Sequence, residues 1–145
     1  MNRERFLVKS YGDNKEGTKV GLAKMLEALK ALDSGATAAI VVPSIGHVKD
    51  TLLVDVLGED VAKRLINNRV LEFDDKSKLV LCACATLKNY TGADVYLALW
   101  GTETTIMSIE KLWQWKTAVL VTWLPQDSEK WVATYSVKTI YDDGH

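Results

Sequence analysis

Two kinds of segment alternate along this chain. Nearly unbroken apolar runs, typical of strands covered on both faces, occur at residues 6–8, 38–42, 79–83, 95–100 and 118–123. Between several of these runs, apolar residues recur at steps of three and four, which indicates amphipathic helices. The clearest helical face consists of Leu22, Met25, Leu26, Leu29 and Leu32. Thr18, just before this face, is its predicted N-cap.

The order of the segments predicts a largely parallel sheet. The first strand, the helix after Thr18 and the strand at 38–42 make one βαβ unit. Two β runs, at 70–73 and 79–83, flank the polar turn that begins at Asp74 and predict an antiparallel hairpin. We therefore expect one α/β domain over residues 1–145. It resembles three-layer Rossmann-like and flavodoxin-like folds, with a mostly parallel sheet of about six to seven strands and the hairpin near 70–83.

Weaker patterns complete the expected order of elements. Helical spacing covers 48–57, 61–66 and 106–113, and an amphipathic helix is predicted from Leu124 to about Tyr135. A short alternating run at 137–141 predicts a last strand at an edge of the sheet.

Charge and hydropathy exclude some partners. The 145 residues include 18 basic and 19 acidic side chains, for a formal net charge of −1. Because a duplex-binding surface needs an excess of Lys and Arg, we expect no duplex nucleic acid as a partner. No apolar stretch approaches the roughly 20 residues of a membrane helix, and no secretory signal is recognisable. We expect no membrane association.

The two cysteines favour a reducing compartment. Cys82 and Cys84 are two residues apart, a spacing that places both on one face of a strand and too far apart for an easy disulfide. We expect free thiols and therefore a cytoplasmic protein. The alternative, half of a metal site, lacks further ligands because the histidines are His47 and His145. We expect no metal site.

The ends of the parallel strands are the expected place for a functional site. Ligands of open α/β sheets bind beyond the carboxyl ends of the strands, where the strand order reverses. The loops at this predicted edge are 10–17, 43–47, 83–88, 101–105 and 123–127.

The first of these loops resembles a phosphate-binding P-loop. Gly12, Gly17, Thr18 and Lys19 follow the pattern Gly-x4-Gly-Lys-Ser/Thr with the last two residues exchanged. The exchange turns each side chain by about 100° around the helix, and no Walker-B carboxylate follows an apolar strand. The alternatives are a weaker anion site at a helix N-terminus and a solvated loop with Thr18 as a cap.

The loop after the strand at 95–100 offers a second candidate. Gly101, Thr102 and Thr104 supply backbone amides and hydroxyls for a phosphate or a ribose. Glu103 beside them favours sugar hydroxyls or a general base over phosphate. Helix capping by Thr102, with Glu103 complementing the helix dipole, is the alternative interpretation.

A histidine and several aromatic rings are further candidates. His47, near Ser44 in a loop at the same edge, is a candidate acid–base group. Trp100 and Trp123 end two strands at this edge and are predicted to stack on a flat ligand. All five tryptophans fall in the last third of the chain, which favours an interface as well.

These features leave three hypotheses open. The first is a binding or sensing domain for a nucleotide-like or other small anionic ligand at the carboxyl edge. Its candidate binding residues are Gly12, Thr18, Ser44, Trp100, Gly101, Thr102, Thr104 and Trp123. The second is an oligomeric interaction module that uses the tryptophan-rich third. The third is a hydrolase or transferase that uses Glu103 and His47. No motif in the sequence indicates whether the protein is an enzyme, and none indicates a cofactor.

Overall fold

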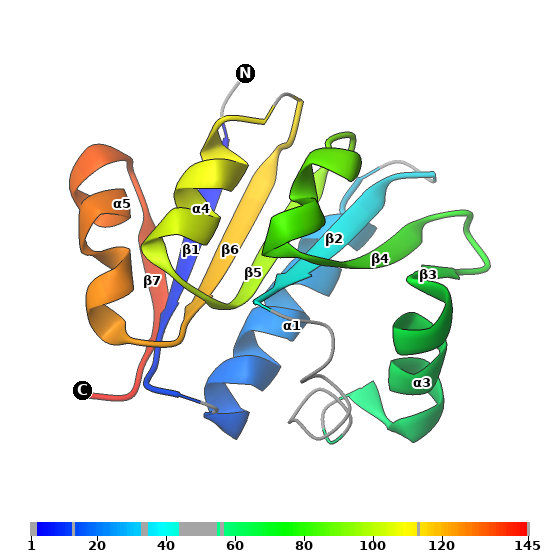
Figure 1. Cartoon of the computed structure of the whole chain (residues 1–145), viewed down its shortest axis with the longest axis horizontal. Coiled ribbons are helices and arrows are strands. Elements are labelled where there is room, and N and C mark those ends of the chain that lie inside the picture. Colours follow the sequence, from blue (N-terminus) through cyan, green and yellow to red (C-terminus); the bar gives the residue numbers. More distant parts are fainter. Residues whose placement is uncertain are drawn as a thin grey trace.

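Seven strands of the described chain form one sheet in the computed structural model (Figure 1), in the order β3-β4-β2-β5-β6-β1-β7. The structure describes residues 3–12, 14–32, 35–43, 55, 57–112 and 114–144. The strands are β1 (Glu4–Lys9), β2 (Thr37–Val42), β3 (Val70–Glu72), β4 (Lys78–Ala83), β5 (Val95–Gly101), β6 (Thr117–Thr122) and β7 (Lys138–Asp142). The α-helices are α1 (Lys15–Lys30), α3 (Glu59–Asn68), α4 (Glu103–Glu110) and α5 (Glu129–Thr134). Short 3₁₀ helices are η2 (Cys84–Asn89) and η3 (Pro125–Ser128).

Strand pairing confirms the predicted α/β class. Neighbouring strands pair in parallel throughout, except β3 and β4, which form the predicted antiparallel hairpin. β7 is the predicted edge strand and pairs with β1. β1 and β2 belong to the expected βαβ unit but are not neighbours, because β6 and β5 lie between them.

Alternating residues of each strand supply two apolar cores. Phe6 and Val8 of β1 pack with Leu22, Met25 and other residues on the face that α1 covers. Leu7 between them points to the opposite face, which holds apolar residues of α4 and α5. Since a strand side chain alternates between faces, a strand made only of apolar residues fits a sheet covered on both sides (Figure 1).

The order of strands reverses between β1 and β6. From β1 the chain passes to α1 on one face, whereas from the neighbouring β6 it passes through η3 to α5 on the other. The two loops therefore separate at the carboxyl edge of the sheet, the position at which such folds hold ligands.

Helix starts are partly as predicted. Thr102 is the N-cap of α4, as expected, and its hydroxyl accepts from the amide of Thr105. The N-cap of α1 is Asn14, whose side chain accepts from the amide of Gly17. The prediction that Thr18 caps this helix was wrong, because Asn14 begins the helix one turn earlier and encloses Thr18 within it.

Some predicted features lie outside the described residues. Ser44, His47 and Trp113 are among these, as is most of the predicted helix at 48–57. No helix of the part that is described has the length and apolar character needed to cross a membrane.

Cys82 and Cys84 are free thiols in very different surroundings. Burial, and secondarily the nearby Cys84, raises the pKa of Cys82 to about 12. At pH 8 only about one Cys82 in 10,000 is then a thiolate, the form that reacts with disulfide reagents. Cys84 is partly exposed.

We expect an aromatic disulfide reagent at pH 8 to label one thiol of the folded protein, Cys84, and two after unfolding in guanidinium. The release of coloured thiolate measures both. The Cys84→Ser variant is the matched control and should release none until it is unfolded. Two equivalents from the folded wild-type protein would contradict the burial of Cys82.

Candidate functional site

The loops after β1 and β6 are locked together at the carboxyl edge. The amide of Ser10 donates to the hydroxyl of Thr122 at 3.0 Å, and that hydroxyl donates to the carbonyl of Ser10 at 2.7 Å. The amide of Gly12 donates to the carbonyl of Trp123 at 2.6 Å. All the atoms of Ser10 and Thr122 are buried. These bonds fix where the two loops separate toward opposite faces.

A cavity of about 430 Å³ lies where these loops separate. Its lining residues are Lys9, Tyr11, Pro125, Gln126 and Glu129. The volume is within the range of small-molecule sites, roughly 300–1,000 Å³. Lys9 is the last residue of β1, and Tyr11 lies in the loop after it. Pro125 and Gln126 belong to η3, and Glu129 is the first residue of α5.

The lining combines one ring with three polar side chains of different kinds. Tyr11 is 56% exposed, so its ring is accessible to a ligand. Gln126 and Glu129 are exposed as well, and Lys9 is half-buried. The amide of Gln126 donates and accepts, the carboxylate of Glu129 accepts, and the ammonium of Lys9 donates. This set can hold a flat polar molecule, with the ammonium of Lys9 available to pair with one anionic group.

Backbone amides of the loop resembling a P-loop are bonded within the protein. The amide of Gly17 donates to the side chain of Asn14 at 2.9 Å, and that of Thr18 donates to the carbonyl of Asn14 at 2.9 Å. The amide of Tyr11 donates to the carboxylate of Asp143 at 2.7 Å. A phosphate cradle needs such amides to point at the ligand, so these three amides are not available to a phosphate, and Asp13 lies outside the described residues.

Thr18 and Trp100 lie together in the core beneath this edge. The indole of Trp100 donates to the hydroxyl of Thr18 at 3.2 Å, and that hydroxyl donates to the carbonyl of Asn14 at 2.8 Å. Thr18 is fully buried and Trp100 is 5% exposed. These two residues therefore join β5 to α1, and neither lines the cavity.

A local distortion of β5 explains the position of Trp100. Its backbone is left-handed, with φ at 55°, and the register with β6 shifts between Leu99 and Gly101. Strict alternation would place Trp100 on the α4 face, beside Ala98. The bulge instead places it in the core of Leu97 and Leu99 on the α1 face. Trp100 is therefore buried in the core, whereas Trp123 is 45% exposed. The two rings thus do not face each other across an open site.

The loop from Gly101 to Thr104 is joined to the loop after β6. The carbonyl of Gly101 accepts from the amide of Trp123 at 3.2 Å, and the amide of Glu103 lies 3.5 Å from a carboxylate oxygen of Asp127. Thr102, Glu103 and Thr104 are exposed beside these contacts. The structure therefore brings Gly12, Gly101, Thr102 and Trp123 to one edge of the sheet, and none of these four residues lines the cavity.

The structure tests the remaining candidates only in part. Ser44 and His47 lie outside the described residues, so the pairing of His47 with Glu103 stays a prediction. Over the described ranges, no group of three His, Cys, Asp or Glu side chains is placed to hold a metal ion. Trp115 and Trp131 are fully buried, so, among the tryptophans that the structure describes, Trp123 is the exposed one that the interface hypothesis can use.

Sequence reasoning did not single out the residues that line the cavity. Tyr11 lies in the candidate loop 10–17, and Gln126 and Glu129 lie near the start of the helix predicted from Leu124. Their position is a usable signal of a binding site, because each lies within three residues of the start or end of a strand or helix at the carboxyl edge. The signal is weak, since polar residues at such boundaries also serve as caps and turns.

Comparison with known proteins identifies no family for this chain. No family model matches it, and no curated protein matches its sequence. One solved structure that matches weakly is a mutant ATPase domain of the large terminase of Thermus phage P74-26, with 10% identity and a TM-score of 0.39. The match covers 83% of this chain and 59% of that domain. A likeness of this degree identifies no shared activity.

Proposed function

We propose that this protein binds a nucleoside monophosphate in the cavity between the loops after β1 and β6. The observation that carries the proposal is the cavity itself, of about 430 Å³ at the reversal of strand order, with an exposed tyrosine and three polar side chains in its lining. In open α/β sheets this position is the usual one for a ligand.

Tyr11 and the three polar side chains of the lining each have a role in this proposal. A base stacks on the ring of Tyr11, and the amide of Gln126 pairs with the edge of the base. Glu129 accepts from ribose hydroxyls, and Lys9 pairs with a single phosphate. One ammonium and one carboxylate give the lining no net charge, which disfavours a triphosphate. The proposal includes no reaction.

The test is calorimetric titration with the four ribonucleoside monophosphates. We expect saturable binding of at least one of them and a loss of roughly 5- to 150-fold in affinity in Tyr11→Ala, because stacking is worth about 1–3 kcal/mol per base. Tyr11→Phe keeps the ring and should bind nearly as well as the wild-type protein.

The matched control is Val132→Ala, which truncates an exposed side chain of α5 that does not line the cavity. It should bind as the wild-type protein does. Equal affinity in Tyr11→Ala and the wild-type protein would place the ligand elsewhere. Absence of saturable binding across the panel would exclude the proposal.

A further inference from the structure

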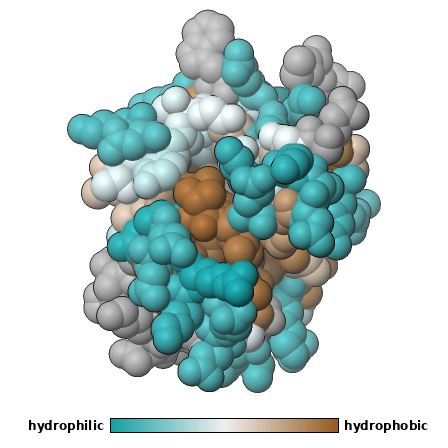
Figure 2. All heavy atoms as spheres, turned by 90° about the vertical axis from the view of Figure 1, so that its right-hand side faces the viewer, coloured by the Kyte–Doolittle hydropathy of each residue, from teal (hydrophilic) through white to brown (hydrophobic). Residues whose placement is uncertain are grey.

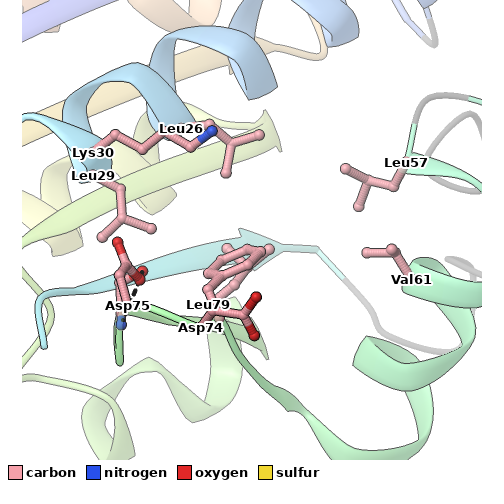
Figure 3. Close-up of a pocket in the computed structure, with 10 residues that line it drawn as sticks. Leu26, Leu29, Lys30, Leu57, Val61, Asp74, Asp75 and Leu79 are labelled. Atoms are coloured by element: carbon pink, nitrogen blue, oxygen red, sulfur yellow. Dashed lines mark hydrogen bonds between the residues drawn. The ribbon is translucent and has the colours of Figure 1, made fainter. Parts of the chain in front are cut away.

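A second cavity lies on the α1 face of the sheet, away from the carboxyl-edge site. Its volume is about 470 Å³, and it shares no lining residue with the first cavity. It lies between α1, the start of α3 and the turn of the β3–β4 hairpin (Figure 3). Its apolar lining consists of Leu26, Leu29, Leu57, Val61, Phe73 and Leu79. A view of this side of the molecule shows apolar surface surrounded by hydrophilic residues (Figure 2).

The polar lining of this cavity is mainly acidic. Asp74, Asp75 and Ser77 come from the hairpin turn, and Lys30 comes from α1. Asp75 accepts from both the amide and the hydroxyl of Ser77. These donors, helped by the charge of Lys30, lower the pKa of Asp75, so the carboxyl is ionised at neutral pH. Asp75 and Lys30 therefore offset each other in part.

Asp74 has no such compensation. Among the residues that the structure describes, no hydrogen bond or ion pair is made by its side chain, and it is exposed. Figure 3 shows Asp75 pointing toward α1, whereas Asp74 points toward the side of the cavity formed by α3. Within the described part of the chain, one uncompensated carboxylate thus stands at the margin of an apolar cavity.

We infer that this cavity binds a small amphipathic cation, an alkyl- or arylammonium whose apolar body packs on the leucines and Phe73 while its ammonium pairs with Asp74. A carboxylate ligand would meet two acidic side chains and one ammonium. A neutral apolar ligand would leave the charge of Asp74 unused. The inference is independent of nucleotide binding, because the two cavities are separate.

The experiment compares two probes of nearly equal shape and opposite charge, 2-phenylethylammonium and 3-phenylpropanoate. Each is titrated into the ¹⁵N-labelled full chain, and amide shifts are followed by NMR. We expect saturable shifts at residues 26–30 and 73–79 with the ammonium probe. The carboxylate should bind about tenfold more weakly or worse, the effect of one ion pair of about 1.4 kcal/mol.

Asp74→Asn keeps the shape of the side chain and should bind both probes equally. Glu72→Gln is the matched control, since it removes an exposed carboxylate from the same hairpin outside the cavity, and it should keep the preference. The inference is overturned if no saturable shift occurs, if both probes bind the wild-type protein equally, or if Asp74→Asn keeps the preference. Loss of the preference in Glu72→Gln would also overturn it, by assigning selectivity to general surface charge.

Discussion

Replacing Glu110 by Ala should destabilise the protein by about 3–5 kcal/mol, the cost of leaving a buried charge without its partner. The carboxylate of Glu110 accepts two bonds from Arg5, at 2.6 and 3.0 Å, and a third from the indole of Trp131 at 2.7 Å. Its side chain is 3% exposed and that of Arg5 is 13% exposed. One carboxylate therefore ties β1, α4 and α5 together.

The aromatic neighbours of Arg5 add to this expectation. Its guanidinium lies 4.3 Å from the centre of the Tyr135 ring and 5.3 Å from that of Trp115. Without Glu110, the guanidinium stays between these rings as an uncompensated charge, and the indole of Trp131 loses its acceptor.

Urea unfolding, followed by circular dichroism, measures the effect. Glu4→Gln is the matched control, because Glu4 is an exposed carboxylate on β1, the strand of Arg5. It should change the free energy of unfolding by no more than about 0.5 kcal/mol. The double variant Arg5→Met with Glu110→Leu, which removes both charges, should recover much of the stability. A loss below about 1 kcal/mol in Glu110→Ala would show that this pair is solvated.

Gly21→Ala should also destabilise the protein, by about 1–3 kcal/mol, although alanine is the better helix former by roughly 1 kcal/mol. A Cβ atom at this position would lie 2.3 Å from a methyl carbon of Val121 on β6. Real Cβ atoms do not come so close to another heavy atom, so α1 or the buried Val121 must move. Gly21 therefore sets the distance between α1 and the sheet.

A double-mutant cycle separates this contact from helix propensity. Val121→Ala removes the methyl groups, so Gly21→Ala should cost less in that background than in the wild-type protein. Equal or greater cost in the Val121→Ala background would contradict the close approach as the cause. Urea unfolding of the four proteins supplies the comparison.

The sequence predicted the elements of the fold better than their arrangement. Apolar runs and polar turns are local signals, so the hairpin, the edge strand and both helix-covered faces were predictable. The neighbours of β1 were not, because pairing with β6 joins residues more than 100 positions apart. The start of α1 was misplaced because Asn14 and Thr18 are both plausible caps, and the bonds of Asn14 decide between them.

The candidate site was predictable as a region but not as a set of residues. The rule for parallel sheets indicates the carboxyl edge, and the cavity between the loops after β1 and β6 lies there. The backbone of Trp100 is itself left-handed, and the resulting bulge moves its side chain to the other face of the sheet. No pattern in the apolar run of β5 signals such a bulge. The position of Trp100 at the end of a strand therefore predicted a ligand-facing residue where the structure has a core residue.

Whether a nucleoside monophosphate occupies the cavity at the reversal of strand order, as we propose, is best tested by NMR mapping. Adenosine and guanosine monophosphates and their pyrimidine counterparts are titrated into the ¹⁵N-labelled chain. We expect at least one of them to give saturable amide shifts at Lys9, Tyr11, Gln126 and Glu129, with little change around Ser77 at the second cavity. Saturable shifts confined to other parts of the chain, or none with any of the four nucleotides, would contradict it.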